Sequence, residues 1–193
     1  MLFHTWPFVL FFLIVYPTYL ALKRTRFRVP WLLTASYFFY ACLNPLYLIL
    51  IAYSTTLDYT VVAIMEKWGR RKIWLLISIL NNLALLSLFK YGGFVTENLN
   101  VLLSSLGIPY SIPAPGIFLP VGLSFYIFQS MSYTIDYYRG NIEREKSFIR
   151  YATFVSLFPR LLAGPIERAK YGLLKFSINR KPIIRAMPRA ISV

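Results

Sequence analysis

Residues 73–91 read IWLLISILNNLALLSLFKY and form the clearest helical run of the sequence. The run carries no charge before Lys90, and Gly92-Gly93 follows it directly. A helix that crosses the hydrocarbon core of a bilayer, roughly 30 Å thick, needs about 20 mainly apolar residues. This stretch therefore predicts a transmembrane helix, and the remaining sequence extends the same pattern.

The whole chain has the composition of a membrane protein. Of its 193 residues, 58% are hydrophobic and 18% are aromatic, while only seven are acidic. A soluble domain of this length could not bury so much apolar surface. We therefore expect an all-α, polytopic integral membrane protein.

The net charge of +14 comes from 21 Lys and Arg residues, which cluster between the apolar runs at residues 23–28 and 67–72. Such clusters are typical of cytoplasmic loops that face anionic lipid. They favour membrane lipid as a partner and argue against nucleic acid. Basic residues follow the first apolar run and do not precede it, which predicts an N-terminus outside and no cleaved signal peptide.

Apolar runs and basic loops together predict about five transmembrane helices. The first covers residues 6–22, and the stretch 30–65 predicts a hairpin, because both basic loops beside it should lie on the same side. Asn44-Pro45 interrupts this stretch, and proline disfavours helix at the residue before it. The fourth helix is the opening run, and the fifth covers residues 117–137.

The run 148–166 is apolar but has basic residues on both flanks, Arg160 inside, and prolines at two positions. A full crossing would leave one basic flank outside, so we interpret it as a re-entrant or interfacial element enclosed by other helices. Residues 1–170 are predicted to form one membrane domain. Residues 171–193 form a basic cytoplasmic tail, or a truncated or out-of-frame end.

The inventory of catalytic side chains is short. His4 is the one histidine and Cys42 the one cysteine, so the chain can assemble neither a Ser-His-Asp triad, nor a disulfide, nor a histidine and cysteine metal site. We expect no catalytic residue, no metal and no bound cofactor. Asp58 and Asp136 lie within apolar runs, where ionisable residues are costly and often functional.

Each of these polar features also has a structural interpretation. Asp58 could bond to nearby hydroxyl groups, and Asp136 to Arg139 one turn further on. Arg160 could bind a phosphate or carboxylate of a carrier or coenzyme, or meet lipid headgroups. A polar helix face could either bond to other helices or line a substrate tunnel. The hydroxyls near Asp58 belong to Thr55, Thr56 and Tyr59, and the polar face consists of Tyr126, Gln129, Ser130, Tyr133 and Tyr137.

Several motifs in order carry a resemblance to a known family. They are LPVGLSFYIFQS at 119–130, YTIDYYRG at 133–140, SYFFYA at 36–41, STTLDY at 54–59, FKY at 89–91 and AGPIER at 163–168. Over about residues 30–170 the chain resembles the membrane-bound O-acyltransferases, nearest to the branch of the alginate O-acetylation proteins.

The resemblance implies the N-terminal half of an acyltransferase of that fold in the bacterial inner membrane. Such an enzyme moves an acyl group, often acetyl, from a cytoplasmic donor (acetyl-CoA or an acyl carrier) to a hydroxyl of an exported cell-envelope polysaccharide. Polysaccharide modification and export proteins are the implied partners. The family's catalytic histidine lies in a later membrane segment and has no counterpart here, so we expect no catalysis by this chain alone.

On this basis Tyr126, Gln129, Asp136 and Arg168 are the residues that we expect to line or support a substrate path. A non-enzymatic membrane scaffold or transporter subunit is a second interpretation, because polar faces and re-entrant elements serve transport as well. A degenerate fragment without function is the third.

Overall fold

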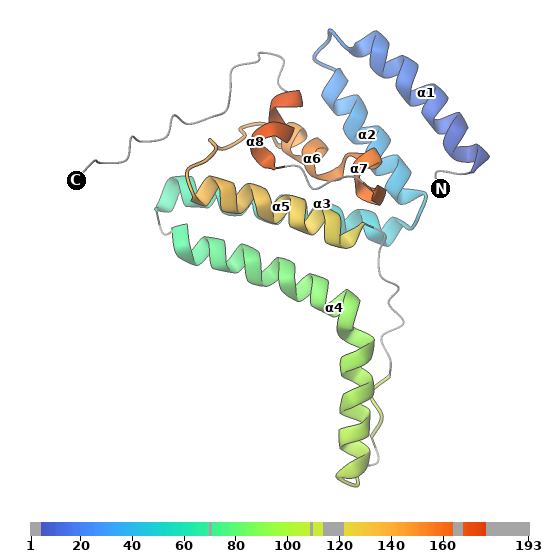
Figure 1. Cartoon of the computed structure of the whole chain (residues 1–193), viewed down its shortest axis with the longest axis vertical. Coiled ribbons are helices and arrows are strands. Elements are labelled where there is room, and N and C mark those ends of the chain that lie inside the picture. The colour runs from blue at the N-terminus through green and yellow to red at the C-terminus, as the bar shows by residue number, and fades with distance from the viewer. Residues whose placement is uncertain (1–4, 70, 109, 114–121, 164–167, 177–193) are drawn as a thin grey trace.

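The computed structural model describes residues 5–69, 71–108, 110–113, 122–163 and 168–176 (Figure 1). Within these ranges all regular structure is helical, as predicted. The elements are α1 (Trp6–Leu22), α2 (Arg28–Ala41), α3 (Pro45–Trp68), α4 (Arg71–Ser105), α5 (Leu123–Tyr138), α6 (Phe148–Ser156), α7 (Phe158–Ala163), α8 (Ala169–Gly172) and the 3₁₀ helix η1 (Leu173–Phe176).

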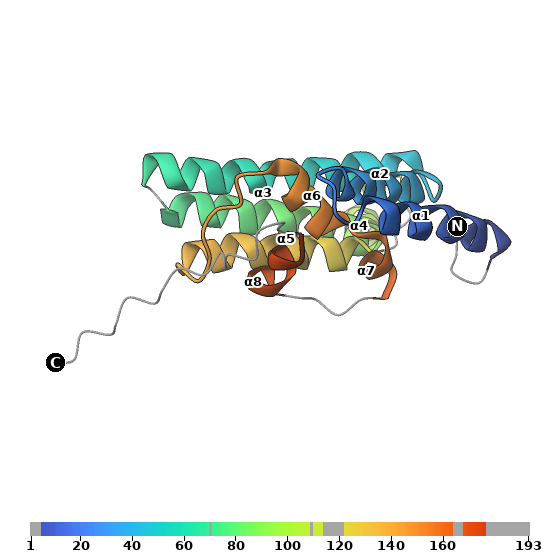
Figure 2. The same cartoon turned by 90° about the horizontal axis from the view of Figure 1, so that it is seen from above.

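Three helices form the centre of the bundle. Helix α3, the first half of α4 and α5 run side by side, and each of the three contacts the other two (Figures 1 and 2). Helix α6 packs against α2, α3 and α5, and α1 packs on α2. The main core therefore lies where α2, α3, α5 and α6 meet, and large buried aromatic side chains such as Tyr40, Tyr133 and Tyr151 fill it.

Two helices, α3 and α4, are long and apolar enough to cross a membrane. In the most apolar 18-residue stretch of α4, only 11% of the residues are buried. Helix α1 likewise exposes large apolar side chains such as Leu10 and Ile14, each 62% exposed. An apolar surface of this extent is stable only against lipid or another protein. The chain is therefore a membrane-associated helical protein.

The helix break predicted at Asn44-Pro45 is confirmed. Asn44 is the N-cap of α3, and its Oδ1 accepts a hydrogen bond of 2.9 Å from the Leu46 N–H. Pro45 occupies the first helical position, where a missing N–H costs nothing. The local sequence is thus sufficient to separate α2 from α3.

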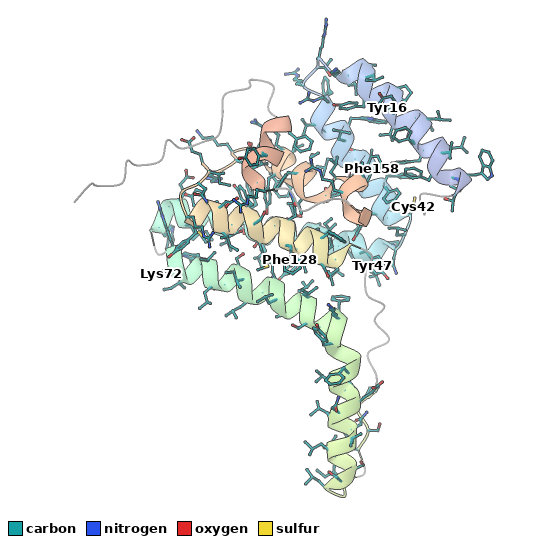
Figure 3. All side chains as sticks on the ribbon, viewed as in Figure 1. Tyr16, Cys42, Tyr47, Lys72, Phe128 and Phe158 are labelled. Atoms are coloured by element: carbon teal, nitrogen blue, oxygen red, sulfur yellow. The ribbon has the colours of Figure 1, made fainter. Side chains whose placement is uncertain are left out.

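The fourth predicted helix is longer than expected. It was expected to end at residue 91, but α4 continues through Gly92-Gly93 to Ser105. Figure 1 shows a bend in α4, with its first half packed in the bundle and its second half projecting away. Figure 3 shows the side chains along this projecting half. Glycine pairs are a usual position for such kinks. Helix α5 begins at Leu123, and residues 117–121 of the predicted span lie outside the described residues.

The apolar run 148–166 divides into two short helices, α6 and α7, with Leu157 between them in a non-helical conformation. At 1.5 Å per residue, neither helix can cross a core of roughly 30 Å. Residues 151–156 are all buried. Residues 151–156 are therefore enclosed by other helices, which agrees with the prediction for this part of the segment. Residues 164–167 lie outside the described residues.

The predicted boundary at residue 170 falls inside α8. The start of the predicted tail continues as the end of α8 and as η1, with Leu173 and Phe176 buried in the core. Gly172 lies against Phe154 so closely that a Cβ atom there would be 2.2 Å from a ring carbon. Residues 177–193 lie outside the described residues.

Candidate functional site

The most polar part of the interior is centred on Asp58 of α3, which is 0% exposed. Ser78 Oγ, from α4, donates to Asp58 Oδ1 at 2.5 Å. Asn82 Nδ2, one turn further along α4, lies 3.0 Å from Oδ1 and 2.9 Å from Oδ2. Ser130 Oγ, from α5, donates to Oδ2. Three neutral donors from two neighbouring helices thus solvate one buried carboxyl group.

A further side chain holds Asn82 in place. Ser54, one turn before Asp58 on α3, donates from its hydroxyl to Asn82 Oδ1 at 2.9 Å. The carboxamide therefore uses both ends, donating through Nδ2 and accepting through Oδ1. Since buried polar groups are costly when they lack partners, this arrangement fixes the register of α3 against α4.

The cluster extends to α6 through a directed pair of hydrogen bonds. Ser130 Oγ and the Tyr151 hydroxyl lie 2.7 Å apart. Because the Ser130 hydrogen is used toward Asp58, the Tyr151 hydroxyl is the donor of this second bond. The chain Tyr151 to Ser130 to Asp58 thus joins α6, α5 and α3. We call Ser54, Asp58, Ser78, Asn82, Ser130 and Tyr151 the Asp58 cluster.

The loop after α5 closes one side of this cluster. The Tyr133 hydroxyl accepts from the Glu145 N–H at 3.0 Å, and the ring of Tyr133 lies 4.5 Å from that of Tyr151. The Tyr59 hydroxyl donates to the backbone carbonyl of Lys146 at 2.7 Å. Tyrosines of α3 and α5 therefore anchor the loop, and Tyr133 packs against Tyr151 of the cluster.

Charged side chains strengthen this closure. Arg144 Nη1 lies 2.7 Å from Glu66 Oε2 at the end of α3, and this hydrogen bond raises the pKa of the guanidinium. The Arg144 guanidinium also lies 5.5 Å from the centroid of the Tyr59 ring. Exposed ion pairs of this kind contribute at most about 1 kcal/mol each, so they orient the loop more than they stabilise the fold.

The four predicted path residues have different surroundings. Tyr126 and Gln129 are 1% and 5% exposed on the face of α5 that carries Ser130. The Tyr126 ring meets Tyr40 edge-on at 6.4 Å, and its hydroxyl has no hydrogen-bond partner among the described residues. Asp136 lies half-buried at the end of α5, and Arg168 is exposed before α8. The structure thus groups Tyr126 and Gln129, and places Asp136 and Arg168 nearer the surface.

The structural alternatives for the two aspartates were wrong in their partners. Thr55 donates to its own helix at Ile51 O, and Tyr59 donates to Lys146 O, so neither bonds to Asp58. Asp136 Oδ1 accepts from Asn141 Nδ2 at 3.3 Å, where Arg139 had been expected. In both cases a residue outside the same helix supplies the donor.

Ser54, Ser78, Asn82 and Tyr151 were not singled out from the sequence. Ser78 and Asn82 did carry a signal, because polar residues four positions apart share one face of an otherwise apolar helix. Tyr151 carried no comparable signal, since tyrosine is common in such runs. The sequence has 15 tyrosines.

Curated proteins match most of the chain. The probable alginate O-acetylase AlgI of Pseudomonas putida is 38% identical over 175 residues, which is 88% of this chain and 36% of that protein. The corresponding protein of Pseudomonas aeruginosa is 37% identical over 175 residues, with 88% and 33% covered. The peptidoglycan O-acetyltransferase of Helicobacter pylori is 31% identical over 171 residues, with 75% and 32% covered.

The chain thus spans about a third of the length of the curated relatives it matches. No family model matches the chain, and no solved structure matches it. A match that covers 88% of the 193 residues includes α3 to α6, the elements that build the Asp58 cluster.

Proposed function

Because this chain belongs to the family of membrane-bound O-acyltransferases, alongside the alginate O-acetylases, we propose that it forms the N-terminal membrane part of an O-acetyltransferase. The acceptor in this proposal is a hydroxyl group of an exported cell-envelope polysaccharide. The observation that carries it is the identity of 38% to an alginate O-acetylase over 175 residues. The match to a peptidoglycan O-acetyltransferase supports a glycan acceptor without choosing one polysaccharide.

The Asp58 cluster supports this function as a framework. Acyl transfer to a hydroxyl needs a base that accepts the hydroxyl proton. Asp58, Ser130 and Tyr151 are all 0% exposed, so an acceptor sugar does not reach them in this arrangement. We assign them the role of fixing four helices, and we assign the base to the family's histidine, which this sequence does not contain.

Helix α5 is the element through which the framework serves the reaction. Ser130 ties it to α3 and α6, so Tyr126 and Gln129 keep their inward orientation. These two buried residues would support the path of the substrates from inside the bundle, and the more exposed Asp136 and Arg168 would line it. The donor, acetyl-CoA or an acyl carrier, would approach from the cytoplasmic side, and polysaccharide modification and export proteins would be the partners.

We further propose that the chain lies in the bacterial inner membrane with about five crossings and its N-terminus outside. The basic loops support this orientation, since cytoplasmic loops are rich in Lys and Arg. Cysteine labelling in a Cys42→Ala background tests it. Asn44→Cys and Asn98→Cys should react with an impermeant maleimide in intact cells, and Arg24→Cys should react only in inverted vesicles. Reaction of the first two positions in inverted vesicles alone would contradict the topology.

A chimera tests the proposed activity. Residues 1–176 replace the matching segment of the Pseudomonas aeruginosa alginate O-acetylase, in a strain without its own copy, and the O-acetyl content of secreted alginate is measured. The chimera should restore acetylation, and the chain expressed alone should not. A chimera that accumulates in the membrane at the level of the intact relative but adds no acetyl groups would refute the enzymatic reading and favour a scaffold or transporter subunit.

A further inference from the structure

A cavity of about 290 Å³ opens beside α1, away from the Asp58 cluster. Its walls come from α1, the start of α2, the break between α6 and α7, and η1. Phe12 and Tyr16 of α1 line it and are 42% and 49% exposed, so the cavity opens toward the outer surface of α1. Its volume is close to the lower limit of about 300 Å³ that is common for small-molecule sites.

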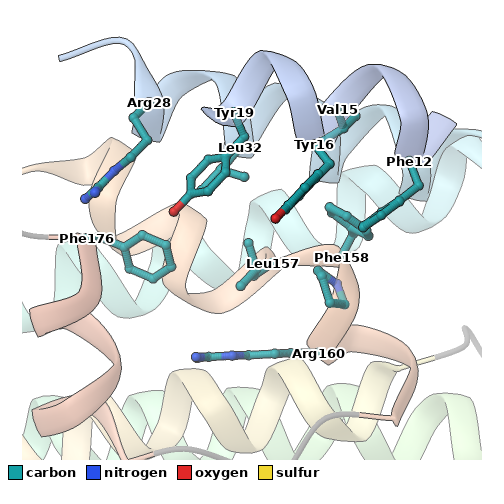
Figure 4. Close-up of a pocket in the computed structure, with 11 residues that line it drawn as sticks. Phe12, Val15, Tyr16, Tyr19, Arg28, Leu32, Leu157, Phe158, Arg160 and Phe176 are labelled. Atoms are coloured by element: carbon teal, nitrogen blue, oxygen red, sulfur yellow. The ribbon is translucent and has the colours of Figure 1, made fainter. Parts of the chain in front are cut away.

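Two arginines from distant parts of the chain line this cavity. Arg28 begins α2, and Arg160 lies in α7. Figure 4 shows both guanidinium groups pointing to the same side, with the ring of Phe176 between them in this view. Two positive charges beside apolar walls favour an anion, and guanidinium groups match the geometry of a phosphate.

Tyrosine hydroxyls add neutral donors to the same space. Figure 4 shows the hydroxyl groups of Tyr16 and Tyr19 turned into the cavity, away from the axis of α1. The rest of the lining is apolar and includes Val15, Leu32 and Leu157. The cavity therefore combines an anion-binding end with apolar walls, which is the pattern of an amphiphilic ligand.

A second cavity provides an internal comparison. It lies on the other side of α1, has a volume of about 490 Å³, and is lined by Leu10, Ile14, Trp31, Phe38 and their neighbours. No charged side chain lines it. A groove between lipid-facing helices thus does not by itself collect arginines, and the charge is specific to the first cavity.

We propose that the cavity between α1 and α7 binds the phosphate of an anionic phospholipid. Arg28 and Arg160 would contact the phosphate, and the Tyr16 and Tyr19 hydroxyls would donate to headgroup oxygens. The volume admits a headgroup but not a whole lipid, so the acyl chains would leave through the open side and lie along the exposed apolar surface of α1. Nothing in the proposed acetyltransferase activity requires this ligand.

Two observations favour a lipid over a soluble phosphate compound. The opening leads to exposed apolar side chains of α1. For such side chains, contact with acyl chains is more favourable than contact with water. Arg28 directly follows the loop that contains the exposed residues Lys23, Arg24 and Arg26. Such a basic segment is attracted to anionic lipid at the membrane surface.

Lipid binding to the purified full chain tests the proposal. The chain in mild detergent is titrated with dioleoyl phosphatidylglycerol or dioleoyl phosphatidylcholine, and bound lipid is counted by native mass spectrometry. We expect one phosphatidylglycerol to bind in preference to phosphatidylcholine. The double variant Arg28→Gln/Arg160→Gln should weaken phosphatidylglycerol binding about tenfold or more, since charge-assisted hydrogen bonds are lost.

Matched variants separate a built site from general positive charge. Arg24→Gln/Arg26→Gln removes the same charge from the exposed loop, and it should retain the preference for phosphatidylglycerol. Tyr19→Phe removes one hydroxyl without altering the packing, and it should weaken binding roughly threefold. Circular dichroism and elution volume identify variants that have not folded. If the double arginine variant has not folded, the phosphatidylglycerol affinity of Tyr19→Phe alone decides whether the proposal holds.

Several outcomes would overturn the proposal. They are equal binding of the two lipids by the wild-type chain, wild-type affinity in the Arg28→Gln/Arg160→Gln variant, or an equal loss in the loop variant. Displacement of phosphatidylglycerol by glycerol 3-phosphate or coenzyme A at concentrations similar to that of the lipid would assign the site to a soluble phosphate compound and would also overturn it.

Discussion

Replacing Asp58 with alanine removes the acceptor on which the buried cluster depends. Ser78 and Ser130 would each lose a hydrogen bond, and Asn82 Nδ2 would lose its bonds to both carboxyl oxygens. A buried donor left without a partner costs about 1–3 kcal/mol. Two effects reduce this cost. Asn82 Nδ2 keeps a bond of 3.0 Å to the Ser78 carbonyl, and serine hydroxyls can turn to carbonyls one helical turn back.

Hydrogen bonds between membrane helices are also weaker than this scale suggests, averaging about 0.6 kcal/mol. Weighing the loss at these three donors against these effects, we expect Asp58→Ala to lower the free energy of unfolding by about 2–4 kcal/mol. For a chain of this length, each kcal/mol shifts the midpoint of thermal unfolding by about 2–4 °C. The midpoint should therefore fall by roughly 4–16 °C.

The assay is the fraction of detergent-solubilised chain that stays monodisperse after heating, followed across temperature. Asp58→Asn is the first control, since it keeps one acceptor oxygen but presents an N–H₂ group to two donors. Its unfolding midpoint should fall about half as far as that of Asp58→Ala. Thr56→Ala is the second, because Thr56 is exposed on the same helix. A midpoint for Asp58→Ala within about 2 °C of the Thr56→Ala value, less than 1 kcal/mol, would refute this account of the cluster.

Two further predictions compare matched pairs. Tyr151→Phe breaks the hydrogen bond to Ser130 and should lower the free energy of unfolding by about 0.5–1.5 kcal/mol. Tyr126→Phe removes a hydroxyl without a partner among the described residues and should leave the stability unchanged or raise it. The same heating assay checks both variants, and an equal loss of stability in the two would contradict the role of the Tyr151 hydrogen bond. Gly172→Ala places a methyl group against the buried ring of Phe154 and should destabilise by about 1–3 kcal/mol. A Cβ atom at Gly93 would have no neighbour within 4 Å, so Gly93→Ala should stabilise α4 by about 1 kcal/mol. Equal unfolding midpoints for the two alanine variants would contradict this prediction.

The sequence predicted the class of the fold because the solvent determines it. Runs of apolar residues need lipid, and Asn44-Pro45 breaks a helix through purely local geometry. Helix ends at glycine were less predictable. Gly69 has φ of 71° and ends α3, while the Gly92-Gly93 pair remains helical within α4. Whether a glycine adopts the left-handed region depends on packing that no local pattern reveals.

The site was predicted in part for a similar reason. Asp58 stands out because a carboxyl group within an apolar run is costly, and that argument needs one residue only. Its partners lie 20, 24 and 72 positions away along the chain, so the spacing within one helix pointed to the wrong hydroxyl groups. Within a membrane, a buried polar side chain is satisfied by whichever helix faces it, and tertiary packing decides which one does.

The break between α6 and α7 lies between the Asp58 cluster and the cavity lined by Arg28 and Arg160. On one side of it, Tyr151 ties α6 to Ser130 and thereby to Asp58. On the other side, the Phe158 N–H donates to Ser36 Oγ of α2 at 3.2 Å, where a missing bond would leave a buried donor unpaired. The residues on either side of the break are thus fixed against α5 and α2, and Arg160, two residues after Phe158, lies beside the cavity. The buried cluster, which is too enclosed to act on a substrate, can thus help to fix the position of Arg160 at the proposed lipid site.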